Sequence, residues 1–336
     1  MHTEMIDSWH RDVWDRLQNS RQQHKFPHAL LLQGPVGIGK DELARLLSQS
    51  LLCQNTADIE GMACGQCQSC RLFNSGNHPD FLQISPEEAG KAIKVDQIRQ
   101  MVSALAMTSH AGGYKVVVVT PADNMNINAA NSLLKTLEEP TDNTLILLVS
   151  VAPACLPATV RSRCQSYTCV LPETGVARNW LSQQLDEGED IDALLELANG
   201  APYTALKLHE TDAIKRWLAC LEQLAQLANG QLDPVTTAAG WNKKDGLQQV
   251  DWFLHALQRM MVTLKTGRQV EQDRLTKLIT GDLRSLDCKR LFILMDNISY
   301  AINNWSTGLN TQLLIEDILI SWAAIFRRSA LASGQN

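Results

Sequence analysis

The sequence predicts an α/β domain with a five-stranded parallel sheet and helices on both faces, followed by regions that are helical throughout. Three observations lead to this fold class. Short apolar, β-branched runs alternate with helical patterns up to about residue 169, as parallel strands and their crossover helices do. A glycine-rich turn joins the first strand to its helix. Beyond Pro172 the β-branched runs stop, and apolar residues recur at helical spacing.

The first 169 residues are expected to contain all the strands. Residues 5–25 read as an amphipathic helix, with Trp14 and Leu17 on its apolar side. The predicted strands cover residues 29–32, 81–84, 115–119, 145–149 and 165–168. Further helices are expected over residues 95–107 and 126–137, and Pro140 stops the second of them. A ligand should lie at the carboxyl ends of such strands.

The turn between the first strand and its helix reads as a phosphate-binding loop. Gly34, Gly39 and Lys40 fit G-x-x-x-x-G-K, and Gly37 lies in the same turn. Backbone N–H groups of such a loop cradle phosphate oxygens, and the lysine reaches the β and γ positions. Asp41 stands where a serine or threonine normally binds Mg²⁺. An ordinary glycine-rich turn is the alternative interpretation.

A working nucleotide site also needs an acid at the end of the third strand. Here Thr120 and Pro121 follow the strand over residues 115–119, and Asp123 is the only acid nearby. Asp41 replaces the hydroxyl that binds Mg²⁺, and Thr120 and Pro121 replace the acids at the strand end. The site therefore lacks the usual metal ligands and the base in two separate places. The sequence therefore predicts a nucleotide-binding fold that does not hydrolyse ATP itself, and whether ATP or ADP still binds is open.

Four cysteines have the spacing of a metal site. Cys53, Cys64, Cys67 and Cys70 form C-x₁₀-C-x₂-C-x₂-C, and four thiolates complete a closed tetrahedral zinc site with a structural role. An iron–sulfur cluster and four unliganded thiols are the alternatives. The other five of the nine cysteines are isolated.

Composition limits location and partners. The N-terminus lacks a secretory signal pattern, and no apolar run reaches membrane-spanning length, so we expect a cytoplasmic protein without membrane contact. A formal net charge of −6 argues against a protein whose whole surface binds nucleic acid. The basic pairs Lys243-Lys244 and Arg327-Arg328 are expected to be solvated surface.

The helical part divides into two predicted regions. Residues 170–209 hold three short helices, over residues 180–185, 191–197 and 203–208. Residues 210–336 hold long helices, and the stretch from Gly230 to Gly246 is expected to be the most loop-like.

Several motifs in this order resemble bacterial clamp-loader subunits of the AAA+ superfamily: PHALLLQGPVGIGK, CGQCQSC, HPDF, KVVVVTPAD, AANSLLKTLEEP and TVRSRC. The resemblance implies an AAA+ core over residues 1–169 with a zinc insertion over 53–70, a lid domain over 170–209 and a helical collar over 210–336. It also implies a hetero-pentamer with gamma/tau and delta subunits within DNA polymerase III holoenzyme. This assembly would load the beta sliding clamp on primed DNA, which the chain would meet through the complex.

The resemblance assigns a role to Arg163. In Ser162-Arg163-Cys164 the family's arginine acts in trans on ATP held by a neighbouring gamma subunit, whereas Tyr203 stands where motor subunits have a lid arginine. The leading hypothesis is a non-hydrolysing stator that donates Arg163. The alternatives are a gamma/tau-like motor subunit with an atypical site, a zinc-dependent DNA-binding module, and an ordinary surface role for Arg163.

Overall fold

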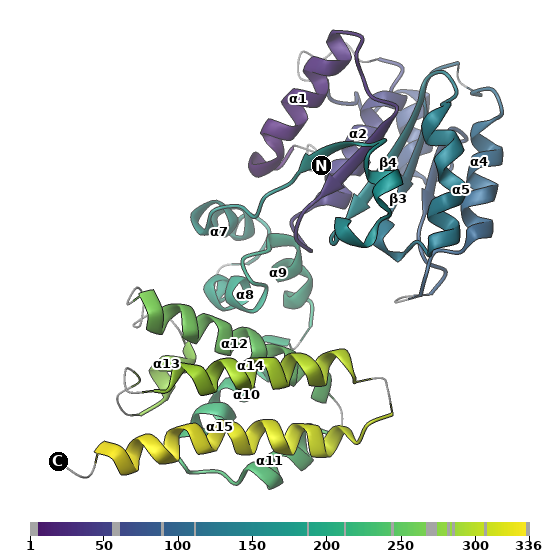
Figure 1. Cartoon of the computed structure of the whole chain (residues 1–336). Helices are drawn as coiled ribbons and strands as arrows, with labels where there is room; N and C mark the ends of the chain where they lie inside the picture. The colour runs from purple at the N-terminus through teal and green to yellow at the C-terminus, as the bar shows by residue number, and fades with distance from the viewer. Residues whose placement is uncertain are drawn as a thin grey trace. The chain divides into compact units, whose positions relative to one another are not determined.

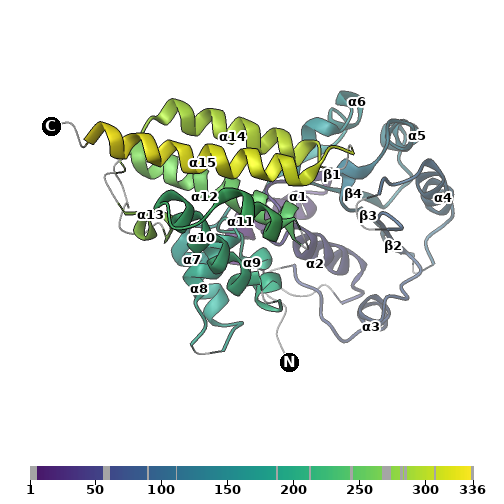
Figure 2. The same cartoon turned by 90° about the horizontal axis from the view of Figure 1, so that it is seen from below.

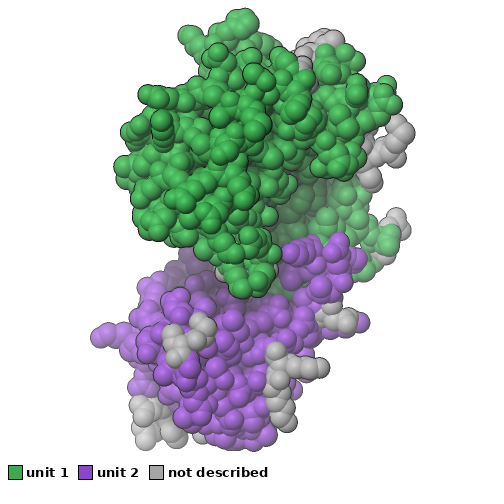
Figure 3. All heavy atoms as spheres, turned by 90° about the vertical axis from the view of Figure 1, so that its right-hand side faces the viewer, with its two compact units in different colours: residues 1–206 green, residues 207–336 purple. Residues whose placement is uncertain are grey.

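The computed structural model describes most of the chain. The described residues are 6–55, 61–88, 91–110, 112–186, 188–211, 213–242, 245–266, 274–280, 283, 286–305 and 308–333, with side chains of the last helix described as far as residue 326. They form two compact units, residues 1–206 and 207–336, drawn in different colours in Figure 3. Lys243, Lys244 and the side chains of Arg327 and Arg328 lie outside the described residues.

A five-stranded parallel sheet forms the centre of the first unit, in the order β2-β3-β4-β1-β5. Its strands are β1 (Ala29–Gln33), β2 (Phe81–Ile84), β3 (Lys115–Val119), β4 (Thr144–Ser150) and β5 (Gln165–Thr168). Every residue of β3 and β4 is buried, which explains why these strands read as continuous apolar runs. The predicted five-stranded α/β core is confirmed.

Helices cover both faces of the sheet (Figure 1). Leu30 and Leu32 face a core shared with α1 (Arg11–Gln22) and α2 (Lys40–Leu52). Leu31, one residue out of phase, faces α4, α5 and α6 on the other side. The bounds of these three helices are Val95–Leu105, Ile127–Glu138 and Ala158–Arg161. The alternation of side chains along each strand thus fills two separate cores.

Short elements connect the main ones. A 3-10 helix, η1 (Ser8–His10), precedes α1, and η2 (Ala122–Asn124) and η3 (Pro153–Cys155) follow β3 and β4. Helix α3 (Gln68–Asn74) lies in the predicted cysteine insertion, between α2 and β2. Three helices then follow the sheet: α7 (Thr174–Ser182), α8 (Ile191–Leu197) and α9 (Pro202–His209). The division into three domains at residues 169 and 209 stays a prediction.

The second unit is helical in every described element. Its helices are α10 (Ala213–Ala228), α11 (Pro234–Trp241), α12 (Gly246–Thr266), α13 (Arg274–Leu278), α14 (Cys288–Asn303) and α15 (Thr311–Ser333). In Figure 2, α14 lies beside α15, and the two pack together. Aromatic residues lie in the core. The rings of Phe253 and Trp322 pack edge to face with their centroids 5.2 Å apart, and the Trp322 indole N–H donates to the Leu224 carbonyl oxygen at 2.8 Å.

One expectation for this unit was wrong. The stretch from Gly230 to Gly246 contains helix α11, although its composition predicted a loop. Asp233 caps the helix by accepting a hydrogen bond from the Thr236 backbone at 2.8 Å, and Pro234 occupies the first turn. An acidic cap followed by proline is a helix start signal, and here it outweighs the surrounding glycines.

Candidate functional site

The glycine turn after β1, at the predicted phosphate-binding positions, contains glycines in left-handed backbone conformations. Gly37 and Gly39 have φ values of 71° and 86°, which side-chain-bearing residues rarely adopt. At Gly34, an added Cβ would lie 2.2 Å from the carbonyl oxygen of Cys169. Helix α2 begins directly after the turn, so its N-terminus faces the loop. The geometry therefore requires glycine at all three predicted positions.

The loop lysine is turned back onto its own loop. Lys40 is only 4% exposed, and its Nζ donates to the carbonyl oxygens of Gly34, at 2.8 Å, and Pro35. Burial lowers the pKa of Lys40, and the charge of Asp41 offsets part of this shift. These two contacts use two of the three N–H donors of the ammonium group and direct it toward its own loop.

Helix α9 packs directly on the glycines of the loop. The Tyr203 backbone N–H donates to the Gly37 carbonyl oxygen at 2.9 Å. A Cβ on Gly37 would lie 1.7 Å from the Thr204 Oγ1, and one on Gly39 would lie 2.4 Å from the Tyr203 ring. The first turn of α9 thus contacts the loop backbone that a nucleotide's phosphates would need.

An aromatic cluster and a partly buried hydrogen bond hold this arrangement. The Tyr203 hydroxyl donates to Asp7 at 3.0 Å, and burial, with the nearby Asp7 charge, raises the pKa of Tyr203. The Trp9 indole donates to the Ile38 carbonyl oxygen at 2.9 Å. The Trp180 ring lies 5.8 Å from Trp9 and 4.8 Å from Tyr203. Sequence reasoning missed Asp7, Trp9 and Trp180 as site residues, because they match no phosphate-loop motif.

The carboxylates of Asp41 and Asp123, near the loop, are hydrogen-bonded to other groups of the protein. Asp41 accepts a hydrogen bond from the Thr120 hydroxyl at 2.6 Å. Asp123 accepts one from the Ser150 hydroxyl and one from the Val151 backbone N–H at 2.6 Å. Asp123 therefore holds the end of β4. The Asp41–Thr120 pair contains one carboxylate and one hydroxyl, with the acid in the first turn of α2 and the hydroxyl directly after β3.

The four predicted cysteines come together. The sulfur atoms of Cys53, Cys64, Cys67 and Cys70 all lie within 4.8 Å of one another, so the group could hold a metal ion. The Cys53–Cys67 and Cys64–Cys70 sulfur distances are 3.9 and 4.0 Å. Tetrahedral zinc with Zn–S bonds of about 2.3 Å requires about 3.8 Å between sulfurs, so the cluster fits this ion.

Backbone groups favour the thiolate form that a metal requires. The N–H of Cys67 points to the Cys64 sulfur, and the N–H of Cys70 to the Cys67 sulfur, each at 3.4 Å. Burial alone would raise the pKa of Cys67, but hydrogen bonds from the Cys70 and Gln54 backbones and from neighbouring thiols lower it to about 6. Such a thiolate is ready to bind a metal at neutral pH.

A buried polar network attaches the cysteine helix to the core. The Ser69 hydroxyl donates to the Leu52 carbonyl oxygen at 2.5 Å and lies 2.8 Å from the His78 Nε2. The Asp80 backbone N–H donates to the His78 Nδ1 at 3.1 Å. These partners fit a neutral imidazole that carries its proton on Nε2, and burial lowers the pKa of His78 accordingly.

Arg163 lies at the opposite end of the sheet from the glycine loop. In the parallel pairing of β1 with β5, Leu30 is opposite Gln165 and Gln33 is opposite Thr168. Arg163 precedes Gln165, whereas the loop follows Gln33. The paired strands between them span about 10 Å at about 3.3 Å per residue. The structure therefore does not bring Arg163 to this chain's own loop.

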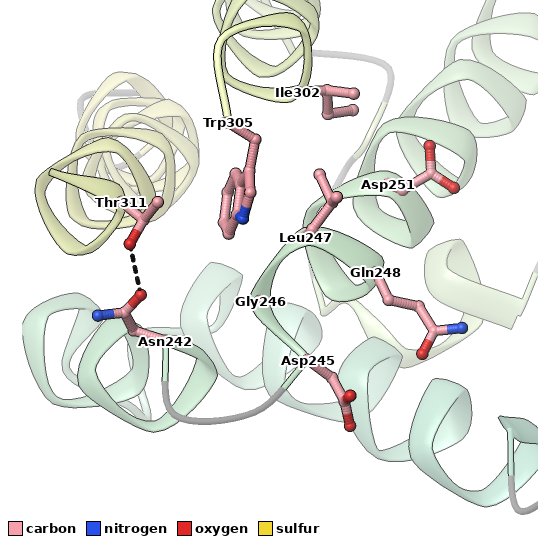
Figure 4. A pocket seen from close by; sticks show the side chains of 9 residues that line it. All are labelled: Asn242, Asp245, Gly246, Leu247, Gln248, Asp251, Ile302, Trp305 and Thr311. Carbon is pink, nitrogen blue, oxygen red and sulfur yellow. Dashed lines mark hydrogen bonds between the residues drawn. The ribbon is translucent and has the colours of Figure 1, made fainter. Parts of the chain in front are cut away.

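The second unit contains a pocket of about 640 Å³. In Figure 4, Trp305 and Leu247 project into the same opening, and Thr311 is hydrogen-bonded to Asn242 at 2.8 Å. The carboxylate of Asp245, also at this pocket, is paired with Arg216 at 2.7 Å. The predicted site residues lie elsewhere, in the first unit, and the pocket has no phosphate-binding loop among its lining residues.

Among the helices of the described residues, none combines the length and the apolar character needed to cross a membrane.

Two family descriptions match the chain: "DNA polymerase III, delta subunit" over residues 9–170 and "DNA polymerase III, delta subunit, C terminal" over residues 211–324.

Curated relatives extend these matches over nearly the whole chain. DNA polymerase III subunit delta' of Pseudomonas aeruginosa is 36% identical over 329 residues, which covers 95% of this chain and 98% of that protein. The Escherichia coli subunit delta' is 32% identical over 319 residues and 93% of each chain. DNA polymerase III subunit tau/gamma of Haemophilus influenzae is 32% identical over 189 residues, covering 55% of this chain and 27% of that protein. The chain therefore belongs to the family of DNA polymerase III delta' subunits.

Proposed function

We propose that this chain is a non-hydrolysing subunit of the bacterial sliding-clamp loader. In this role it joins gamma/tau and delta subunits in a cytoplasmic hetero-pentamer that loads the beta clamp on primed DNA. The family membership and the relationship to a tau/gamma subunit support this assembly. The chain is then a part of DNA polymerase III holoenzyme without ATPase activity of its own.

The observation that carries the proposal is the contrast between the two ends of the sheet. At one end α9 packs on the phosphate loop, Lys40 binds its own loop carbonyls, and Asp123 holds β4. At the other end the Arg163 side chain is 35% exposed. A guanidinium supplied by a partner stabilises the charge that develops during phosphoryl transfer. Arg163 is thus suited to a neighbour's ATP.

Steady-state ATP hydrolysis by the reconstituted complex tests the proposal. Arg163→Ala should lower hydrolysis at the one neighbouring gamma/tau site that receives this arginine by on the order of 10³-fold, the lower range for arginines donated in trans, while leaving assembly intact. Arg161→Ala is the matched control, because Arg161 is exposed two residues away. Turnover that is unchanged by Arg163→Ala would refute the donor role.

We also propose that the four-cysteine cluster holds a structural Zn²⁺. The sulfur spacing and the backbone N–H groups directed at the Cys64 and Cys67 sulfurs support this assignment. The four thiolates would hold the ion and leave no open position for water, so the metal would supply fold stability rather than catalysis.

A second candidate function is a motor subunit with an atypical site. The Asp41–Thr120 hydrogen bond favours it, because this pair offers one carboxylate and one hydroxyl oxygen near the loop, the same ligand types as an ordinary Mg²⁺ site with their positions exchanged. This candidate predicts that the isolated chain hydrolyses ATP and that Lys40→Ala abolishes the activity. An inactive isolated chain would exclude it.

A further inference from the structure

The Arg163 guanidinium is held by two groups of its own chain. Its Nη1 donates to the Thr159 carbonyl oxygen at 2.9 Å, and its Nη2 forms an ion pair with the Glu138 carboxylate. Glu138 is the last residue of α5, and Thr159 lies within α6. Two helices that are adjacent in the fold therefore fix the direction of one side chain.

The backbone on both sides of this ion pair is anchored in the core. Leu137, next to Glu138, is 2% exposed, and its carbonyl oxygen lies 2.9 Å from the Nε2 of His28, the residue before β1. Val160 is fully buried near Arg163, and Cys164 packs partly into the same core as Leu137. The backbone that carries Glu138 and Arg163 is therefore fixed by the core.

The ion pair leaves the guanidinium able to bind a second anion. Arginine has five N–H donors, and the contacts with Thr159 and Glu138 use two of them. The remaining three can bind phosphate oxygens while the two contacts persist. An unrestrained arginine loses much side-chain entropy when it binds, and a second contact made in advance reduces that loss.

We infer that Glu138 is a positioning residue that orients Arg163 for the ATP bound by a neighbouring subunit. This inference rests on the proposed donor role of Arg163. In the opposite arrangement, Glu138 holds Arg163 away from the ATP and must release it before hydrolysis. The two arrangements predict opposite effects of removing Glu138 on the rate of ATP turnover. If Glu138 holds Arg163 away, removing Glu138 accelerates turnover, whereas under positioning it slows turnover.

ATP hydrolysis by the reconstituted complex separates these outcomes. We expect Glu138→Ala to lower kcat about fivefold, which converts to about 1 kcal/mol, the upper value for an exposed ion pair. The KM for ATP should change by less than about twofold, because the contact acts on the transition state. Glu138→Gln keeps an acceptor and should recover part of the loss. Glu139→Ala is the matched control, since Glu139 is the adjacent exposed acid.

The same change in an Arg163→Ala background shows whether Glu138 acts through the arginine. Positioning requires that Glu138→Ala has no further effect there. The inference is overturned if Glu138→Ala leaves kcat unchanged or raises it, or if it lowers kcat equally without Arg163. If Arg163→Ala leaves turnover unchanged, the donor role itself fails, and this outcome is distinct from an effect of Arg163→Ala without an effect of Glu138→Ala.

Discussion

Substitution of Gly37 by alanine tests whether α9 is docked on the phosphate loop. The φ of Gly37 is 71°, and the new Cβ would lie 1.7 Å from the Thr204 Oγ1 and 2.9 Å from the Thr204 backbone nitrogen. Rotation of the threonine side chain relieves the first contact but not the second. The helix must therefore shift away from the loop.

Gly76 provides a matched control. Its φ is 74°, and an added Cβ would have no neighbour within 4 Å. Alanine in this backbone region costs about 1–2 kcal/mol at either position. Gly37→Ala is further destabilised by about 1–3 kcal/mol, because its new methyl group overlaps helix α9. We expect Gly37→Ala to lower the free energy of unfolding by about 2–5 kcal/mol and Gly76→Ala by about 1–2 kcal/mol.

Thermal unfolding and hydrogen exchange measure the difference. Each additional kcal/mol should lower the midpoint by about 2–4 °C for a unit of this size. Amide exchange in α9 should increase in Gly37→Ala and not in Gly76→Ala, because only the first change pushes the helix from the loop. Equal midpoints and equal exchange in α9 would refute the docking of this helix on the glycines.

Three further predictions concern the metal cluster, His78 and Lys40. Metal analysis should find about one zinc per chain, and Cys67→Ser should lose both the zinc and part of the thermal stability, whereas exposed Cys155→Ser should keep both. Because the folded pKa of His78 is lowered, its contribution to stability is full above the unfolded pKa of about 6.5 and is lost as pH falls through the folded pKa. Urea unfolding between pH 7 and pH 5.5 should show this decline in the native chain, and His78→Gln should flatten it; a variant with the native slope would contradict the assignment. Lys40→Met leaves two loop carbonyls without their donor, so we expect a loss of about 1–3 kcal/mol in urea unfolding. Equilibrium binding of labelled ATP should be absent before and after this change, and Mg²⁺-dependent binding that Lys40→Met removes would contradict the blocked loop.

The sequence predicted most of the architecture because its signals are local. Strands buried on both faces, such as β3 and β4, read as continuous apolar runs, and the helix over residues 126–137 was found within one residue of α5. The cysteine cluster was predicted from spacing, since four cysteines within one short insertion are close in sequence and therefore close in space. The resemblance to DNA polymerase III subunits is confirmed by the family matches.

Element boundaries were less accurate where local signals conflict. Helix α7 begins at Thr174, earlier than the apolar pattern from Trp180 indicated. The composition around α11 predicts a loop because glycines flank it on both sides, although Asp233 and Pro234 form a helix start signal. The boundaries of the predicted domains and the role of Arg163 stay predictions.

By itself, the sequence determined where the five strands lie along the chain, the position of the glycine turn after the first strand, and the four-cysteine group. Only the tertiary structure decided that Lys40 turns back, that Tyr203 meets Asp7, and that Glu138 holds Arg163. The Tyr203–Asp7 contact joins residues 196 positions apart, and the Arg163–Glu138 contact joins residues 25 apart. Local periodicity reports on neighbours within a few residues, whereas these contacts depend on how whole helices pack against the sheet.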